Sequence, residues 1–288
     1  MRWEDQRRSD NVEDRRGMRA GGGLPLKGGI GTIVVVLIVS WLTGASPLTL
    51  FQLAGGLGGD AQQAPAQEGS VGAPTGDPQA EFAAVVLAST EDAWTRVFQQ
   101  AGERYQAPRL VLFSDAVSSA CGTNSAAVGP FYCPADRKVY IDLGFFRELD
   151  QKFGAPGDFA QAYVIAHEVG HHLQVLLGVS EQVQAARQRV SDVEGNRLSV
   201  LQELQADCFA GVWGNHARDR MLQEGDVEEG LRAAAAIGDD TLQRRSQGRV
   251  SPESWTHGSS EQRVEWLRRG LSQGTIEACD TFGQAARR

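Results

Sequence analysis

The sequence His-Glu-Val-Gly-His at residues 167–171 constrains this chain more than any other feature. Residues four apart on an α-helix lie about one turn apart on the same face, so His167 and His171 can offer two imidazoles to one zinc ion. Glu168 projects beside them, where it can act as a general base toward a metal-activated water. The motif therefore predicts a catalytic zinc site. A helix that merely carries surface histidines is the alternative.

Apolar residues recur at three- and four-residue steps over residues 158–177, which predicts a helix with one face against the core. His167 and His171 fall at the border of that face. His172 lies further round the helix, so we expect it either to support the site from outside the ligand set or to be exposed. A purely structural zinc site would need a fourth protein ligand, for which His172 or His216 would have to reach the metal.

A catalytic zinc ion keeps three protein ligands and one open position, so a third ligand is needed. Residues 196–218 show a continuous helical pattern in which Glu203 and Asp207 stand four apart in a largely uncharged stretch. We expect Glu203 to be the third ligand and Asp207 to accept the N–H of a zinc-bound imidazole. The alternatives for the third ligand are His216, His257 and Glu194.

A HExxH motif followed by ExxxD on a second helix is similar to the gluzincin arrangement, and the chain most closely resembles the bacterial family of neutral zinc metallopeptidases. Outside residues 52–76 the resemblance covers nearly the whole chain. It implies Zn²⁺ as cofactor, a polypeptide substrate, and a zincin-like α+β domain that is mostly helical with a small sheet. The segments that carry it are residues 2–3, 9–16 (SDNVEDRR), 129–134 (GPFYCP), 166–172 (AHEVGHH), 203–208 (ELQADC) and 256–260 (THGSS) with Arg263.

The resemblance also implies roles outside the zinc motif. Thr256-His257 with Arg263 resembles the histidine–arginine segment that faces the metal in CAAX-processing peptidases, which implies that His257 stabilises the oxyanion. Alternatively, His257 merely precedes a helix over residues 260–269. In zincins a strand before the HExxH helix lines the cleft, and the resemblance implies this role for residues 138–142.

An uncharged apolar run near the N-terminus predicts attachment to a membrane. No charged residue occurs between Gly28 and Gly59, and residues 29–51 are long enough to span a bilayer. Residues 1–28 carry seven Lys and Arg, and none occurs from residue 28 to residue 95. This asymmetry predicts a cytoplasmic basic tail over 1–28, a single-pass anchor over 29–51 in the cell membrane, and an extracytoplasmic catalytic domain. A cleaved signal peptide is the alternative.

The remaining chain divides into a linker and one domain. Residues 52–76 are rich in Gly, Ala, Gln and Pro and predict a flexible tether, after which Asp77 would cap a helix to about residue 100. Residues 109–113 and 138–143 read as short strands, and the domain would cover 77–288. An oxidising compartment would allow Cys121 to pair with Cys133 and Cys208 with Cys279, although Cys208 could instead be a free buried thiol.

Two classes of function fit these features. The net charge of −8 argues against nucleic acid as a partner. The first class is a membrane-anchored zinc endopeptidase that hydrolyses extracytoplasmic polypeptides. The second is a catalytically silent zinc-binding module that acts as a tethered chaperone or adaptor. The intact Glu168 favours the peptidase.

Overall fold

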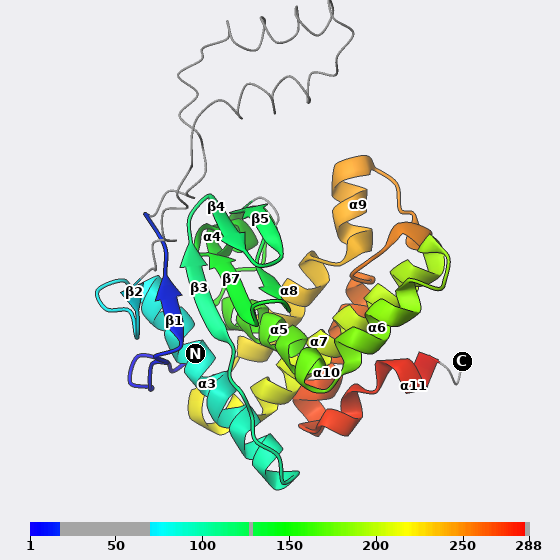
Figure 1. Cartoon of the computed structure of the whole chain (residues 1–288). Coiled ribbons are helices and arrows are strands. Elements are labelled where there is room, and N and C mark those ends of the chain that lie inside the picture. Colours follow the sequence, from blue (N-terminus) through cyan, green and yellow to red (C-terminus); the bar gives the residue numbers. More distant parts are fainter. Residues whose placement is uncertain (18–69, 127–128, 286–288) are drawn as a thin grey trace, which may run out of the picture. The chain divides into compact units, whose positions relative to one another are not determined.

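The computed structural model describes residues 1–17, 70–126 and 129–285, and it shows a mostly helical α+β fold with a small sheet (Figure 1). One sheet has the strand order β2-β1-β3-β7-β6. The inner strands β1, β3 and β7 are parallel, and the outer strands β2 and β6 are antiparallel to their neighbours. The bounds are Ser70–Val71 for β2, Val12–Asp14 for β1, Arg109–Phe113 for β3, Lys138–Asp142 for β7 and Phe131–Cys133 for β6.

Both faces of this sheet are covered. Leu110 and Leu112 of β3 pack in the main core with the helices, whereas Val111 and Phe113 belong to a smaller cluster on the other face. A hairpin of β4 (Ala116–Ser119) and β5 (Gly122–Ser125) contributes to that second cluster. A strand buried on both sides is uniformly apolar rather than alternating, which explains the Leu-Val-Leu-Phe run of β3.

The N-terminal residues Met1–Gly17 belong to the same compact unit as the rest of the described chain. Strand β1 pairs in parallel with β3, and Val12 is fully buried. Residues 1–17 therefore do not form the separate tail that was expected over 1–28, because they supply a strand of the sheet. Hydrogen-bonded strands lie on one side of any membrane. The expected topology, with residues 1–28 inside and the domain 77–288 outside, is incompatible with this pairing.

The expected anchor over 29–51 lies outside the described residues, as does the expected linker up to residue 69. Within the described ranges, no helix has the length and apolar character needed to cross a bilayer. The end of the expected linker is part of the fold, because β2 pairs with β1 and Gly72 donates its N–H to the carbonyl of Val12. The folded unit therefore resumes before residue 77.

The helices expected from periodicity are present. Helix α3 (Pro78–Gln100) is capped by the Asp77 carboxylate, as the sequence predicts. The motif helix is α5 (Asp158–Leu176), and the helix with Glu203 is α7 (Asp192–Met221), longer than expected because a Ser191–Glu194 capping box starts it earlier. The others are α4 (Gly144–Gln151), α6 (Val179–Arg187), α8 (Asp226–Ala236), α9 (Asp239–Gln247), α10 (Ser260–Gln273) and α11 (Thr281–Ala285).

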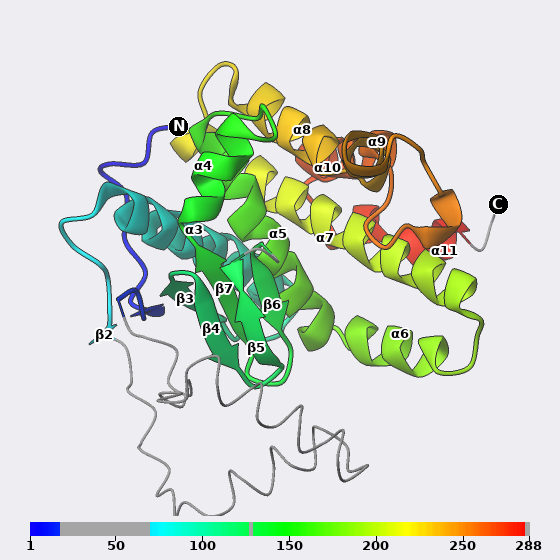
Figure 2. The same ribbon diagram turned by 90° about the horizontal axis from the view of Figure 1, so that it is seen from above.

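Helix α5 packs between the sheet and α7 (Figure 2). Gly170, inside the zinc motif, lets the two helices approach closely, because a Cβ atom there would lie 2.9 Å from the carbonyl oxygen of Ala206. The rings of Phe159 on α5 and Trp213 on α7 stack with centroids 5.7 Å apart. This close packing fixes the register between the two helices that carry the candidate ligands.

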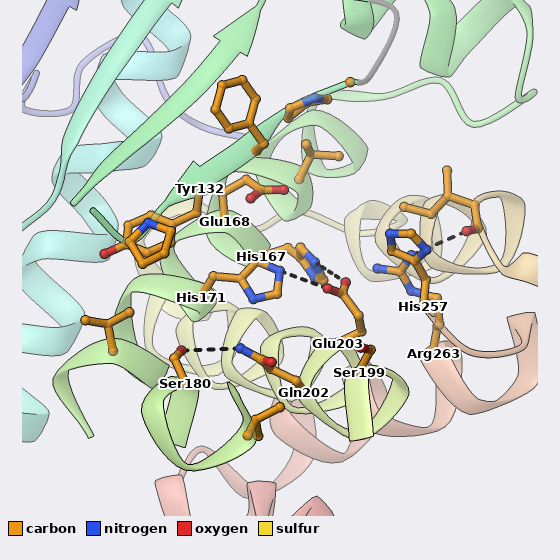
Figure 3. Close-up of a pocket in the computed structure, with 18 of the residues that line it drawn as sticks. Tyr132, His167, Glu168, His171, Ser180, Ser199, Gln202, Glu203, His257 and Arg263 are labelled. Atoms are coloured by element: carbon orange, nitrogen blue, oxygen red, sulfur yellow. Dashed lines mark hydrogen bonds and ion pairs between the residues drawn. The ribbon is translucent and has the colours of Figure 1, made fainter. Parts of the chain in front are cut away.

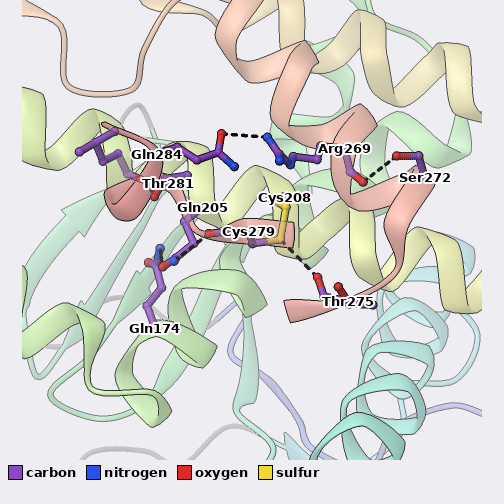
Figure 4. The surroundings of a disulfide bond; sticks show 10 residues. Gln174, Gln205, Cys208, Arg269, Ser272, Thr275, Cys279, Thr281 and Gln284 are labelled. Atoms are coloured by element: carbon purple, nitrogen blue, oxygen red, sulfur yellow. Dashed lines mark hydrogen bonds between the residues drawn. A yellow bond between two sulfur atoms is a disulfide. The ribbon is translucent and has the colours of Figure 1, made fainter. Parts of the chain in front are cut away.

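Both expected disulfides are present. Cys121–Cys133 joins the β4–β5 hairpin turn to β6, and Cys208–Cys279 joins α7 to a 3₁₀ helix at Ile276–Cys279 (Figure 4). Cys208 is therefore not a free thiol, and these two bonds use all four cysteines.

Candidate metal centre

Helices α5 and α7 bring three side chains of metal-binding type to one point. The ligand atoms of His167, His171 and Glu203 lie within 4.8 Å of one another. The Nε2 atom of His167 is 3.2 Å from Glu203 Oε2, and that of His171 is 3.4 Å from Glu203 Oε1 (Figure 3). Two imidazole nitrogens and a carboxylate are a donor set that suits Zn²⁺.

Hydrogen bonds hold both histidines in the tautomer that a metal requires. His167 Nδ1 lies 2.8 Å from Asp207 Oδ1, and His171 Nδ1 lies 2.9 Å from Gln174 Oε1. Because the oxygens can only accept, each Nδ1 carries a hydrogen and donates it. The Nε2 atom of each ring is then the nitrogen that faces Glu203 and that would bind a metal ion. The sequence predicted the role of Asp207, whereas Gln174, three residues beyond His171 on the same helix face, was missed.

The other candidates for the third ligand lie elsewhere. Glu194 forms the capping box at the exposed start of α7. His216 bonds through Nε2 to the carbonyl of Gly274, and His257 lines the cavity without joining the three-residue group. Glu203 is thus the carboxylate that meets both histidines.

The centre favours positive charge between its carboxylates. Burial lowers the pKa of His167, but Asp207 and Glu203 outweigh burial and raise it to about 10. Burial raises the pKa of Glu203, yet His171 and His167 hold it well below its ordinary value. The negative charge of these carboxylates would also stabilise a metal cation bound between the imidazoles. Burial raises the pKa of Glu168, which is only 7% exposed, and a raised carboxyl pKa suits a general base.

Asp207 is the centre of a fully buried polar network. Its carboxylate accepts hydrogen bonds from Tyr163 Oη at 2.5 Å and from Arg263 Nε and Nη2 at 2.8 and 2.9 Å, besides His167. Burial raises the pKa of Asp207, but Arg263 and His167 outweigh it and lower the pKa to about 2. Arg263, expected to face the metal beside His257, instead binds this carboxylate. Tyr163 was missed, although it stands one helical turn before His167.

His257 reaches the cavity from the loop between α9 and α10 (Figure 3). Its Nδ1 lies 3.3 Å from Asp239 Oδ1, and its side chain is 52% exposed. Asp239 Oδ2 also accepts the backbone N–H groups of Thr256, His257 and Gly258 at 2.9, 2.7 and 3.0 Å. The hydrogen bond to Asp239 raises the pKa of His257. Asp239 therefore fixes both the loop and the imidazole.

His172 is buried, not exposed, with 1% of its surface accessible. Its Nε2 lies 2.6 Å from the carbonyl oxygen of Gln106, and its Nδ1 lies 3.0 Å from Tyr132 Oη. Burial lowers the pKa of His172 to about 4, so the ring is neutral at pH 7 and ties α5 to β6. It does not point to the metal centre, which argues against a fourth ligand from this position.

The strand beside the cleft is β6 rather than residues 138–142. Strand β7 is bonded to β3 on one side and to β6 on the other, so it has no free edge. Strand β6 is the outermost strand on this side of the described sheet, and Phe131 and Tyr132 line the cavity. This cavity of about 1380 Å³ contains His167, Glu168, His171, Glu203 and His257. Its volume exceeds that of a typical small-molecule pocket.

These observations define the class: a protein with a HExxH motif on one helix, completed at a candidate metal centre by a glutamate from a second helix. The chain belongs to the family described as "Putative neutral zinc metallopeptidase", whose model matches residues 1–282. It is 47% identical over 294 residues to the uncharacterized protein YpfJ of Escherichia coli, covering 99% of this chain and 100% of the relative. An uncharacterized protein of Mycobacterium tuberculosis is 40% identical over 223 residues, covering 73% of this chain and 74% of the relative. No solved structure matches this chain.

Proposed function

We propose that this protein is a zinc-dependent endopeptidase of the zincin type. The observation that carries the proposal is the convergence of His167, His171 and Glu203 beside the buried Glu168 in a wide cavity. Its substrate would be an extended polypeptide.

The three converging residues would hold the ion, and zinc bound there would supply a Lewis acid that polarises a carbonyl and activates water. In this proposal Glu168 takes a proton from the attacking water and passes it to the leaving amine. Asp207 and Gln174 hold the two imidazoles in the required tautomer. Glu168 thus transfers the proton, whereas Asp207 and Gln174 orient the two imidazole rings.

The oxyanion that develops during attack needs a hydrogen-bond donor besides the metal. His257 is our candidate, because its Nδ1 faces Asp239 and its half-exposed ring lines the cavity. The free edge of β6 is a candidate for pairing with the substrate backbone.

The direct test is cleavage of an unfolded protein by the full-length, zinc-loaded chain, with and without a chelator. We expect chelator-sensitive fragments from the parent and none from Glu168→Gln, which keeps the candidate ligands. A chain that binds zinc but never cleaves would instead support the silent chaperone or adaptor module.

We further propose that the folded unit works outside the cytoplasm, since two disulfides favour an oxidising compartment. Membrane attachment through residues 29–51 is part of the proposal, on the strength of the apolar sequence. Because β1 pairs with β3, the exposed Asp10 and Arg244 should share one side. Cysteines substituted singly at these positions should both react with an impermeant maleimide on intact spheroplasts. Protection of the Asp10→Cys protein until lysis while Arg244→Cys reacts would overturn the shared side, and protection of both would overturn the location outside the cytoplasm.

A further inference from the structure

The cavity around the candidate metal centre has chemically different ends. Five apolar side chains line it beside the N-terminal half of α5, one turn or more before the metal-binding histidines. They come from α4 and the loop after it, from α5, and from the α8–α9 region. These residues are Phe145, Phe153, Val164, Ile237 and Leu242.

Printed contacts bring these segments together. The rings of Phe145 and Phe153 lie with centroids 6.3 Å apart. Arg245 on α9 donates to the carbonyl of Lys152, which directly precedes Phe153, at 3.2 Å. Leu242 stands three residues before Arg245 and so shares its helix face. This contact ties α9, which carries Leu242, to the segment that carries Phe153, and both side chains line the same cavity.

Hydrogen bonds of Arg263 join the segments that carry the remaining two residues. Arg263 donates to the carbonyl of Ile237 at 3.4 Å and to Tyr163 Oη at 3.1 Å, and Val164 follows Tyr163 directly. Val164 itself is 5% exposed and lies on α5 one turn before Glu168. The five apolar residues thus come from segments that are tied to one another beside the candidate general base.

The opposite end, beyond the C-terminus of α5, is mostly polar. Two valines, Val175 and Val183, line the cavity there. The other lining residues at this end are polar: Ser180, Glu181, Gln184, Arg187, Gln188, Ser199 and Gln202. Ser180 and Gln202 hydrogen-bond across the two helices, with Gln202 Nε2 donating at 3.3 Å (Figure 3). The two ends therefore offer different surfaces to the two halves of a bound peptide.

We infer that the apolar end is a specificity subsite that selects a large aliphatic or aromatic side chain on one side of the scissile bond, while the α6 end accepts polar residues. This inference rests on the proposed peptidase function. Partly exposed apolar side chains such as that of Leu242 leave water when a matching substrate side chain covers them, and a Leu in place of a small residue gains about 10-fold or more in binding. Leu242 is the residue whose substitution reports on the subsite.

The test uses full-length, zinc-loaded Glu168→Gln protein and fluorescent, unstructured ten-residue peptides in which one Leu or one Ser is moved along a Gly/Ser background. We expect the best Leu peptide to bind about 10-fold more tightly than its Ser counterpart. Leu242→Glu should remove most of that ratio. The matched control Gln247→Glu, which is exposed on the same helix and does not line the cavity, should leave it unchanged.

Equal binding of the Leu and Ser peptides, absence of binding, or a ratio that Leu242→Glu does not change would each overturn the subsite. Cleavage of the same peptides by the parent protein tests the proposed function separately. Selective binding without cleavage would refute the peptidase and keep the subsite. Cleavage without selectivity would do the reverse.

Discussion

Arg263 donates two hydrogen bonds to the Asp207 carboxylate, from Nε to Oδ2 at 2.8 Å and from Nη2 to Oδ1 at 2.9 Å. The same Oδ1 accepts a hydrogen bond from His167 Nδ1. All three side chains are buried. The guanidinium therefore holds the carboxylate that orients a candidate zinc ligand, although Arg263 itself is not among the candidate ligands.

Replacing this arginine should weaken metal binding. Arg263→Lys keeps the charge but cannot make the two-pronged contact, so we expect zinc affinity to fall by about 10-fold. Competition with a chromophoric chelator measures it. Arg268→Lys, on the exposed face of the same helix, is the control. A folded Arg263→Lys protein with the parent's affinity would show that Asp207 does not need this partner.

Substitution of the candidate ligand Glu203 and of the candidate general base Glu168 should have different effects on zinc content and on turnover. Glu203→Ala removes a candidate ligand, so we expect the protein to lose most of its zinc on dialysis. Glu168→Gln removes no candidate ligand and should retain about one zinc per chain while losing turnover. Elemental analysis measures the zinc content per chain of the parent and of the two variants. A Glu203→Ala protein with the zinc content of the parent would mean that another residue completes the site.

The loop histidine should affect turnover without affecting metal content. If His257 donates to the developing oxyanion, His257→Ala should lower kcat by about 100- to 1000-fold with unchanged zinc. His216→Ala is the matched control, because that imidazole lines no part of the cleft and bonds to Gly274. Unchanged kcat in His257→Ala would leave the histidine with a structural role only.

The two disulfides should differ in their contribution to stability. Chain-entropy arguments give about 4 kcal/mol for the Cys208–Cys279 loop and about 3 kcal/mol for the shorter Cys121–Cys133 loop, because the sequence separations are 71 and 12. Urea unfolding of the two double Cys→Ala variants compares them. A larger loss for the Cys121 and Cys133 pair would contradict the loop-length argument.

The N-terminal strand should contribute a pH-dependent part of the stability. Burial raises the pKa of Glu13, but hydrogen bonds from Arg15 and Lys138 outweigh burial and lower it. A lowered folded-state pKa stabilises the protein above the unfolded pKa, near 4.5, and this contribution is lost as pH falls through the folded pKa.

We therefore expect Glu13→Gln to lower the free energy of unfolding at pH 7 by about 1–2 kcal/mol and by much less at pH 3. Urea unfolding at both pH values measures this difference, with the exposed Glu265→Gln as control. A Glu13→Gln protein as stable as the parent at pH 7 would count against the docking of β1.

The sequence by itself determined the local features. Helical spacing placed His167, His171 and Glu168 on one helix and Glu203 with Asp207 on another, since a period of 3.6 residues decides which side chains share a face. The apolar runs predicted β3 and β7, and the aspartate at residue 77 with the proline at residue 78 predicted the start of α3.

Only the tertiary structure decided which distant segments meet. The sequence left four candidates for the third ligand, and the packing of α7 on α5 brings Glu203 to both histidines. It also pairs Arg263 with Asp207 and Asp239 with His257, contacts that span 56 and 18 residues. The charges of residues 1–28 predicted a tail, whereas β1 pairs with β3 because its buried Val12 and paired Glu13 fit that edge. Spacing along a chain decides which side chains share one helix or strand, whereas such long-range contacts depend on how the helices and strands pack.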